Sequence, residues 1–246
     1  MIKQKEILTD SAPMELSPML VAGVGAAVPI LFSSPMVRAI ASGRKTMTRR
    51  IINLDPEEHG FTKLVIDPEL CGTDDDDEII PVVKKGLWAQ FDKGEEHVKC
   101  SFGNIGGTLW VRETFYPKTL AEEPPGDRYW YKADYHFKDE MPTKKWKPSI
   151  FMPKDACRLR LTIKNIRVER LHEMTEEDAH AEGIEMNNKP HAGWYWMEDV
   201  YCTDSPLKAF ELLWKKINGE KSWNENPYVW VIQFERAAGC CANTCY

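Results

Sequence analysis

The sequence predicts an α+β fold, in which a mostly antiparallel sheet forms a small β-barrel with helices in its connections. First, segments with strand character outnumber helical ones along the 246 residues. Second, the longest of them, 157–171, alternates apolar and polar residues and slips in phase at Asn165. Such a slip indicates a bulge and the strong bend that suits a small closed barrel. Third, prolines, glycines and an acidic run interrupt 53–104, so we expect a large insertion, mainly loop with one hairpin.

The first elements follow from apolar runs and their flanking residues. Residues 1–28 show little periodicity and are interpreted as an N-terminal extension. The short apolar run 29–32 predicts a buried strand. Ser34 and Pro35 then have the residue types that cap and open a helix. Gly43 should end this helix, because glycine readily adopts the left-handed conformation that lets the chain reverse.

Later elements alternate between strands and helices. A glycine turn precedes a strand at 108–113, and a second candidate strand covers 128–133. Thr175 opens a capping-box pattern, which predicts a short helix that stops at Gly183. Two further segments complete the pattern, an amphipathic helix that starts after Ser205 and a last strand at 228–235.

Composition limits the domain organisation and the compartment. We expect one domain over 29–236, followed by a cysteine-containing tail at 237–246. The net charge of −6 argues against a protein that coats long nucleic acids. Seven cysteines without a secretory or membrane-spanning segment favour a cytoplasmic protein with reduced thiols and no membrane partner. No standard ligand spacing is present, so neither a metal nor a cofactor is expected.

The segment 43–50 has the highest density of reactive groups, since it combines an amine, hydroxyls and guanidinium groups. Lys45 and Thr48 form the kind of pair that could activate a hydroxyl nucleophile. The same residues could instead contact a phosphate. A basic helix-to-strand junction without chemistry is the third interpretation.

This segment also carries a family motif. Four residues fill the fixed positions of the pattern G-x-K-x-x-T-x-R, namely Gly43, Lys45, Thr48 and Arg50. Tryptophan-containing segments follow in order at 109–113, 146–149 and 229–232. In these features the chain resembles the ASCH domain family of the PUA-like superfamily, whose members are common in bacteria and their phages. The resemblance covers 29–236 apart from the insertion.

The resemblance implies a function in nucleoside or RNA chemistry. Some ASCH proteins are amidohydrolases that act on N4-acetylcytidine, through the motif lysine and threonine and a later glutamate in a short helix. The matching residues here are Lys45, Thr48 and Glu182. Other relatives are regarded as RNA-binding or RNA-acting, so an RNA-binding regulatory module and an RNA-cleaving enzyme are the alternatives.

Each candidate residue has a chemical role and a plain alternative. Thr48 would be the nucleophile and Lys45 its base. Glu182 would end a helix, where the dipole disfavours a negative charge and favours an acid that protonates the leaving N4. It could equally be a solvated helix-end glutamate.

We expect four further residues to bind the nucleoside or RNA: Gly43, Arg50, Trp146 and Lys147. Arg50 could hold the developing oxyanion. The aromatic segment 191–196 could stack a base or could belong to the core.

Overall fold

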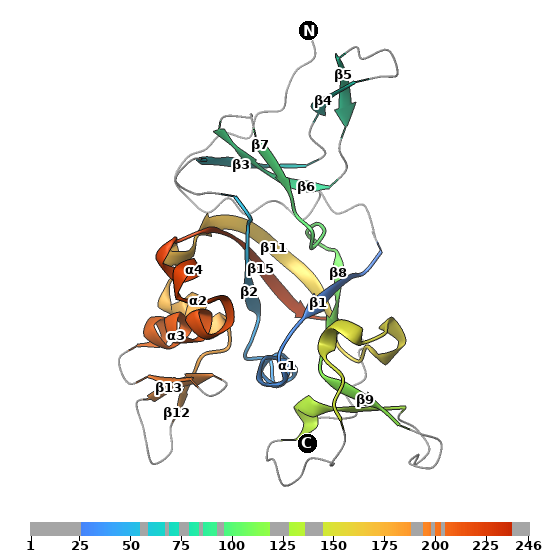
Figure 1. Ribbon diagram of the computed structural model, residues 1–246, viewed down its shortest axis with the longest axis vertical. Helices are drawn as coiled ribbons and strands as arrows, with labels where there is room; N and C mark the ends of the chain where they lie inside the picture. Colours follow the sequence, from blue (N-terminus) through green and yellow to red (C-terminus); the bar gives the residue numbers. More distant parts are fainter. Residues whose placement is uncertain are drawn as a thin grey trace.

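The computed structural model describes residues 26–54, 59–66, 69–73, 79–83, 86–92, 96–118, 128–135, 145–187, 194–197, 200–202 and 205–237. Most of the predicted extension, the acidic run 74–78 and most of the cysteine tail lie outside these ranges. The described chain is an α+β structure with mostly antiparallel sheets, which confirms the coarse prediction (Figure 1). None of its described helices combines the length and apolar character needed to cross a membrane.

A five-stranded sheet forms the centre of the molecule. Its strand order is β1 (Val28–Leu31), β8 (Thr108–Arg112), β11 (Arg160–Arg170), β15 (Tyr228–Arg236) and β2 (Met47–Ile51). β1 and β8 run parallel, and the other neighbours run antiparallel. Figure 1 shows β11 and β15 as long, curved neighbours. Among the described strands, β1 and β2 are the edges of this sheet, so closure into a barrel stays a prediction.

The predicted bulge is present in β11. The register between β11 and β15 shifts between Ile163 and Asn165, which leaves Lys164 as the extra residue. Without a bulge, Ile163 and Ile166 would face opposite sides of the sheet, because they are an odd number of residues apart. Both belong to the same core cluster, so the bulge returns the apolar residues to one face.

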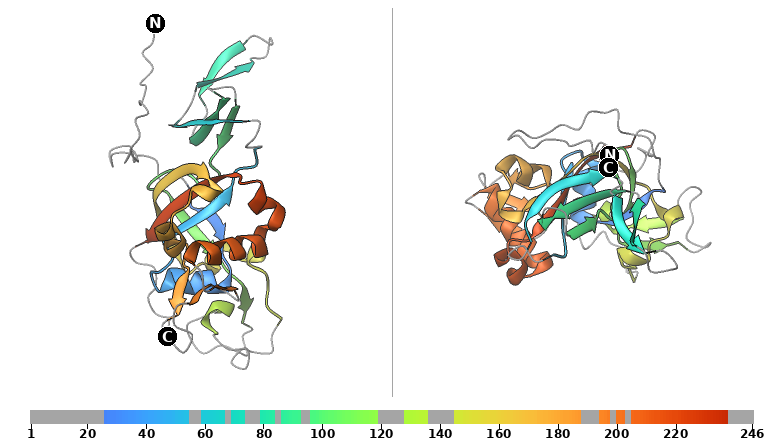
Figure 2. Two further views of the ribbon diagram at one scale, coloured as in Figure 1. Left: turned by 90° about the vertical axis from the view of Figure 1, so that its left-hand side faces the viewer. Right: turned by 90° about the horizontal axis from the view of Figure 1, so that it is seen from above.

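β15 is buried on both faces. Trp230, Ile232 and Phe234 face one core cluster together with Ile163 and Ile166. Its intervening valines face a second cluster that includes buried residues of α3 (Pro206–Asn218). Two short helices complete this side, α2 (Glu176–Ala181) and α4 (Glu220–Asn224), and Figure 2 shows the helices packed beside the curved sheet.

The helix starts follow their capping residues closely. α1 covers Ser34–Ala41, with Ser33 rather than the predicted Ser34 at the N-cap position. In α2 the predicted capping box forms, since the backbone N–H of Asp178 donates to the Thr175 hydroxyl at 3.2 Å. Ser205 caps α3 through a 3.1 Å hydrogen bond from the backbone N–H of Lys208.

The insertion is more ordered than the sequence predicted. Its described strands form one three-stranded sheet and one hairpin: β3 (Phe61–Ile66), β6 (Leu87–Phe91) and β7 (Glu96–Lys99), then β4 (Glu69–Thr73) with β5 (Ile79–Val83). The expectation of a mainly loop insertion was therefore wrong. Leu87, Ala89 and Phe91 alternate inward, and the Phe91 ring lies 5.3 Å from that of Tyr228 on the main sheet. Figure 2 shows the insertion at one end of the molecule.

The remaining described elements are short. They are β9 (Phe115–Pro117), β10 (Tyr129–Tyr131), η4 (Lys132–Asp134), η6 (Ser149–Phe151), η7 (Lys154–Ala156), η8 (Leu171–Glu173), β12 (Glu185–Asn187), β13 (Trp194–Met197) and β14 (Val200–Cys202). The strand predicted at 128–133 is shorter than expected, because the chain turns into η4 after Tyr131.

Candidate functional site

The turn after α1 delivers Lys45 into the interior. Gly43 has φ 78°, the left-handed conformation expected at this position. The backbone N–H groups of Arg44 and Lys45 both donate to the Ala39 carbonyl, at 2.9 and 3.0 Å. As a result the Lys45 side chain points inward, and the residue is 2% exposed.

Inside the protein, Lys45 meets Glu182. Its Nζ donates to Glu182 Oε2 at 2.6 Å and to the Glu182 backbone carbonyl at 2.8 Å. Burial lowers the pKa of Lys45, and the nearby Glu182 carboxylate only partly opposes this effect. The fold thus brings together two residues that the sequence placed in one site, although they lie 137 positions apart.

Gly183 makes this close approach possible. It follows Glu182 with φ 102° and ends α2 where the sequence predicted a stop. A Cβ atom there would lie 3.3 Å from Lys45 Cβ, 3.3 Å from Ala39 Cβ and 3.1 Å from Met197 Cε. The backbone conformation therefore favours glycine, and an added Cβ would lie closer to these atoms than ordinary van der Waals contact allows.

Arg49 also belongs to the site, although it is not among the predicted catalytic and binding residues. Its side chain is fully buried. One terminal nitrogen, Nη2, lies 2.6 Å from Glu169 Oε1 and 2.6 Å from Asp178 Oδ2. The other, Nη1, lies 3.4 Å from Glu182 Oε1.

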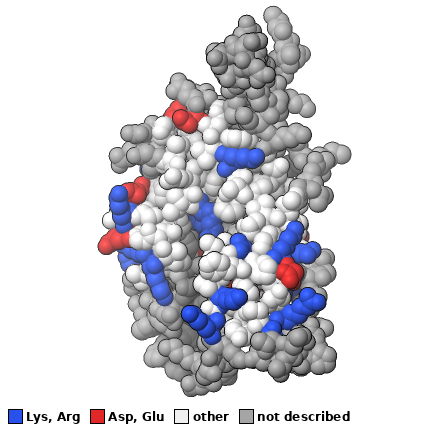
Figure 3. Space-filling view, turned by 45° about the vertical axis from the view of Figure 1, so that its right-hand side comes forward, with Lys and Arg blue, Asp and Glu red and all other residues white. Residues whose placement is uncertain are grey.

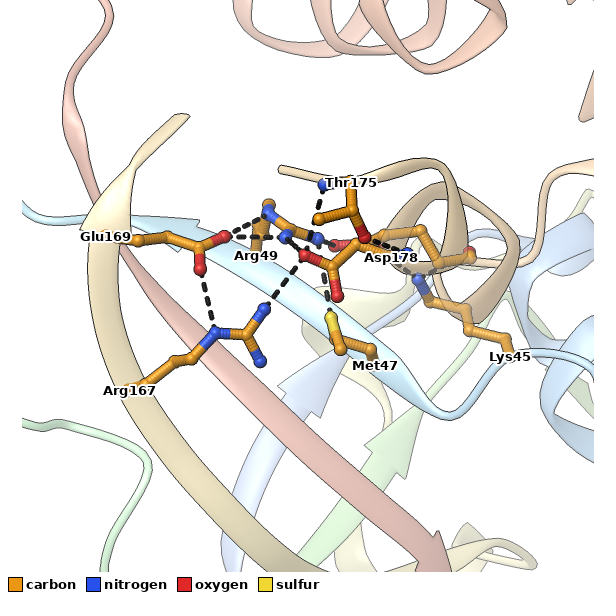
Figure 4. A network of polar contacts seen from close by, with 8 residues as sticks. Lys45, Met47, Arg49, Arg167, Glu169, Thr175 and Asp178 are labelled. Atoms are coloured by element: carbon orange, nitrogen blue, oxygen red, sulfur yellow. Dashed lines mark hydrogen bonds and ion pairs between the residues drawn. The ribbon is translucent and has the colours of Figure 1, made fainter. Parts of the chain in front are cut away.

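These residues form one connected network, shown in Figure 4. Arg167 extends it, with Nε 2.7 Å from Glu169 Oε2 and Nη2 2.9 Å from Asp178 Oδ2. Partial burial disfavours the charged form of Asp178, but Arg49 and Arg167 outweigh it and lower its pKa. The network pairs three cations with three carboxylates: Lys45, Arg49 and Arg167 with Glu169, Asp178 and Glu182.

Thr48 and Arg50 lie on the other face of β2. They pair in register with Ile232 and Trp230 of β15, whose side chains belong to the first core cluster. Thr48 is buried, and within the described chain no direct hydrogen bond joins its hydroxyl to Lys45. The structure therefore places Thr48 on the strand that follows Lys45, without the nucleophile–base contact.

Arg50 approaches Lys45 at an aromatic ring. Its Cζ lies 5.3 Å from the centre of the Phe32 ring, and Lys45 Nζ lies 5.7 Å from the same centre. Arg50 Nη2 donates to the Leu31 carbonyl at 2.7 Å, while its buried Nε has no partner among the described residues. The unpartnered Nε leaves Arg50 with a charged donor suited to an anionic group.

The other predicted binding residues have different neighbours. Lys147 forms a β-bridge with Phe115, and the Trp146 ring lies 5.8 Å from that of Tyr135. These contacts give no direct link to Lys45 or Glu182. Of the aromatic segment, 191–193 lies outside the described residues, and Trp194–Met197 forms β13.

A second buried carboxylate lies at the end of β8. Glu113 accepts hydrogen bonds from Arg158 Nε at 2.8 Å and from Nη2 at 2.9 Å. Burial raises the pKa of Glu113, although Arg158 opposes the shift. Arg158 also lies 2.6 Å from Asp134 and 4.0 Å above the Tyr131 ring, so this pair ties β8 to β10 and η4.

Comparisons with protein-family models, curated proteins and solved structures returned no match. Within the ranges described above, no group of three or more His, Cys, Asp or Glu side chains could hold a metal ion. The functional interpretation therefore depends on the residues of the site and on the motif in 43–50.

Proposed function

We propose that this protein is an ASCH-type enzyme with a PUA-like sheet, which hydrolyses an N4-acyl amide of cytidine. The buried contact between Lys45 and Glu182, with Nζ and Oε2 2.6 Å apart, is the observation that carries this proposal. A charged pair removed from water is costly, and perturbed ionisable groups concentrate at functional sites. The residues that meet here also match the motif lysine and the later glutamate.

In the proposed reaction the Thr48 hydroxyl attacks the amide carbonyl and passes its proton to the neutral Lys45 amine. The lowered pKa of Lys45 supports this role, because a larger fraction of the amine is then available as a base. Arg50 stabilises the oxyanion that forms on the carbonyl oxygen. Lys45 returns its proton to the departing N4, which leaves an acyl group on Thr48.

Water completes the reaction in a second step. The Glu182 carboxylate orients Lys45, which removes a proton from the water that attacks the acyl group. The proton returns to the Thr48 oxygen as the product leaves as a carboxylic acid. Substrate would have to bring the Thr48 hydroxyl and the Lys45 amine into hydrogen-bond reach, since free enzymes commonly hold catalytic groups further apart.

The test is incubation of the purified protein with N4-acetylcytidine while cytidine is followed by chromatography. Thr48→Val and Glu182→Gln should each lower turnover by at least about 100-fold. Thr46→Val is the matched control, because Thr46 carries the same hydroxyl two positions away but is exposed. No cytidine from the intact protein, or equal losses in both threonine variants, would refute the proposal.

A second candidate is an RNA-binding module without catalysis. The face in Figure 3 supports it, because Lys and Arg side chains are spread widely there and acidic ones occupy few places. Binding of this kind should weaken steeply with salt, whereas hydrolysis of a free nucleoside should not. Fluorescence anisotropy with a labelled single-stranded RNA, repeated at increasing salt concentrations, tests it. Anisotropy that stays at the value of the free RNA even at low salt would contradict it.

A further inference from the structure

Arg49 lies where one side chain reaches three carboxylates. Two of them, Asp178 and Glu182, belong to the same helical segment and are four residues apart, so they lie on the same side of α2. The third, Glu169, comes from β11. Arg49 itself belongs to β2, directly after Thr48. One guanidinium therefore connects β11 and the end of α2 to the strand that carries the proposed nucleophile.

We propose that Arg49 is a positioning residue that fixes the Glu182 carboxylate and thereby sets the charge state of Lys45. The inference rests on the proposed function for the roles of Lys45 and Glu182. Its structural part, the control of one ionisable group by another, does not depend on any substrate.

The two oxygens of Glu182 are shared between two cations. Oε2 lies 2.6 Å from Lys45 Nζ, and Oε1 lies 3.4 Å from Arg49 Nη1. The carboxylate cannot turn fully toward Lys45 without giving up Arg49. Arg49 in turn cannot follow Glu182, because its shorter contacts to Glu169 and Asp178 hold it in place.

The groups around Lys45 determine whether its amine is protonated, so the position of the Glu182 carboxylate affects the charge of Lys45. Glu182 at the end of α2 favours the charged amine, while Arg49 and Arg50 from β2 disfavour it. Directly after β1 the amine meets the Phe32 ring, and from the end of α2 the Glu182 backbone carbonyl accepts a hydrogen bond from it at 2.8 Å. Removing Arg49 would take away one repelling charge and leave Glu182 to Lys45 alone. Both changes favour the protonated amine, which cannot act as a base.

Arginine is needed here for its shape as well as its charge. Its planar group presents several N–H donors in fixed directions, and Nε, Nη1 and Nη2 all have carboxylate partners. A lysine could keep the charge, but its single ammonium could not serve three carboxylates in this geometry. Arg49→Lys and Arg49→Met therefore separate geometry from charge.

The experiment follows the titration of Lys45 by NMR in the full chain with 13C-labelled lysine side chains. The signal is assigned by its loss in Lys45→Arg. Arg49→Met should move the titration midpoint of Lys45 upward. Arg167→Gln is the control, because Arg167 contacts the same Glu169 and Asp178 but makes no contact with Glu182. It should leave the midpoint where it is.

Kinetics provide the second measurement. Arg49→Lys should lower kcat by about 100-fold with little change in KM, because the reacting groups are displaced while the substrate contacts remain. The alkaline rise of its pH–rate profile should stay close to that of the original protein. If Arg49→Met does not fold, Arg49→Lys decides, and an unchanged kcat would overturn the proposal.

The outcomes distinguish the effect of Arg49 on Lys45 from the proposed amide hydrolysis. An upward midpoint in Arg49→Met without any turnover by the intact protein would support the control of Lys45 and refute the amidohydrolase. An unchanged midpoint in folded Arg49→Met, or an equal rise in Arg167→Gln, would overturn the role of Arg49 whatever the activity.

Discussion

Replacing Gly183 by alanine tests how tightly the site is built. The added Cβ would lie 3.3 Å from Lys45 Cβ and from Ala39 Cβ. These two atoms are fixed to the backbone and cannot swing away, unlike Met197 Cε at 3.1 Å. The left-handed conformation costs a non-glycine residue about 1–2 kcal/mol, and overpacking adds about 1–3 kcal/mol. We expect Gly183→Ala to lower the free energy of unfolding by about 2–5 kcal/mol.

Gly43→Ala is the matched control for this substitution. Gly43 has φ 78° but no atom within 4 Å of the position of a Cβ, so it carries the conformational cost without the crowding. It should lose about 1–2 kcal/mol. Urea denaturation followed by tryptophan fluorescence gives both values. Equal losses in the two variants would refute the argument that Lys45 and Ala39 crowd Gly183.

Two further substitutions and one labelling experiment have defined outcomes. Glu182→Gln leaves the buried Lys45 without its counter-charge and should cost about 3–5 kcal/mol in urea denaturation at pH 5. This loss of stability should shrink as pH rises, because Lys45 then gives up its proton. The double variant Lys45→Met with Glu182→Leu should recover part of the lost stability. A loss that does not depend on pH would contradict the role of the Lys45 charge. The lowered pKa of Asp178 means that its charged form stabilises the fold above the ordinary carboxyl range, and this stability is lost as pH falls through the lowered value. Asp178→Asn should therefore be less stable at pH 7, with a difference that vanishes in acid; a constant difference would exclude the charge as its cause. Burial raises the pKa of Cys100 to about 11, so iodoacetamide at pH 8 should label it only after unfolding, and peptide mass spectrometry that finds it labelled in the native protein would disprove its burial.

Local signals predicted much of the fold. The capping box at Thr175 and the bulge near Asn165 depend on neighbouring residues and on one partner strand, so the sequence contains what is needed to find them. The motif and its context predicted that Lys45 and Glu182 belong to one site. No local pattern could have predicted this, because the two residues lie far apart in the sequence. The insertion was misjudged because prolines and charges obscured a short alternation at 87–91 that becomes clear once its packing on Tyr228 is known.

Arg49 shows what local reasoning cannot reach. Arg44, Arg49 and Arg50 look alike in the sequence, yet Arg44 forms a surface ion pair with Glu185, while the Arg49 side chain is fully buried. The alternation of β2 places Arg49 on the face of the buried Met47, which is the one available signal. Its carboxylate partners come from β11 and α2, and they approach it only in the folded chain.

The pairing of β2 with β15 affects the order in which the protein folds during translation. β2 pairs with β15, and Arg236 at the end of β15 donates to the Ala41 carbonyl, 195 positions earlier. During translation β2 must therefore wait, with its backbone unpaired, until almost the whole described chain has left the ribosome. The insertion strands pair with near neighbours in the sequence and can form while β2 waits. The Lys45–Glu182 contact is consequently a late event in folding, and a chain that stops before β15 loses the partner strand that holds β2 in place.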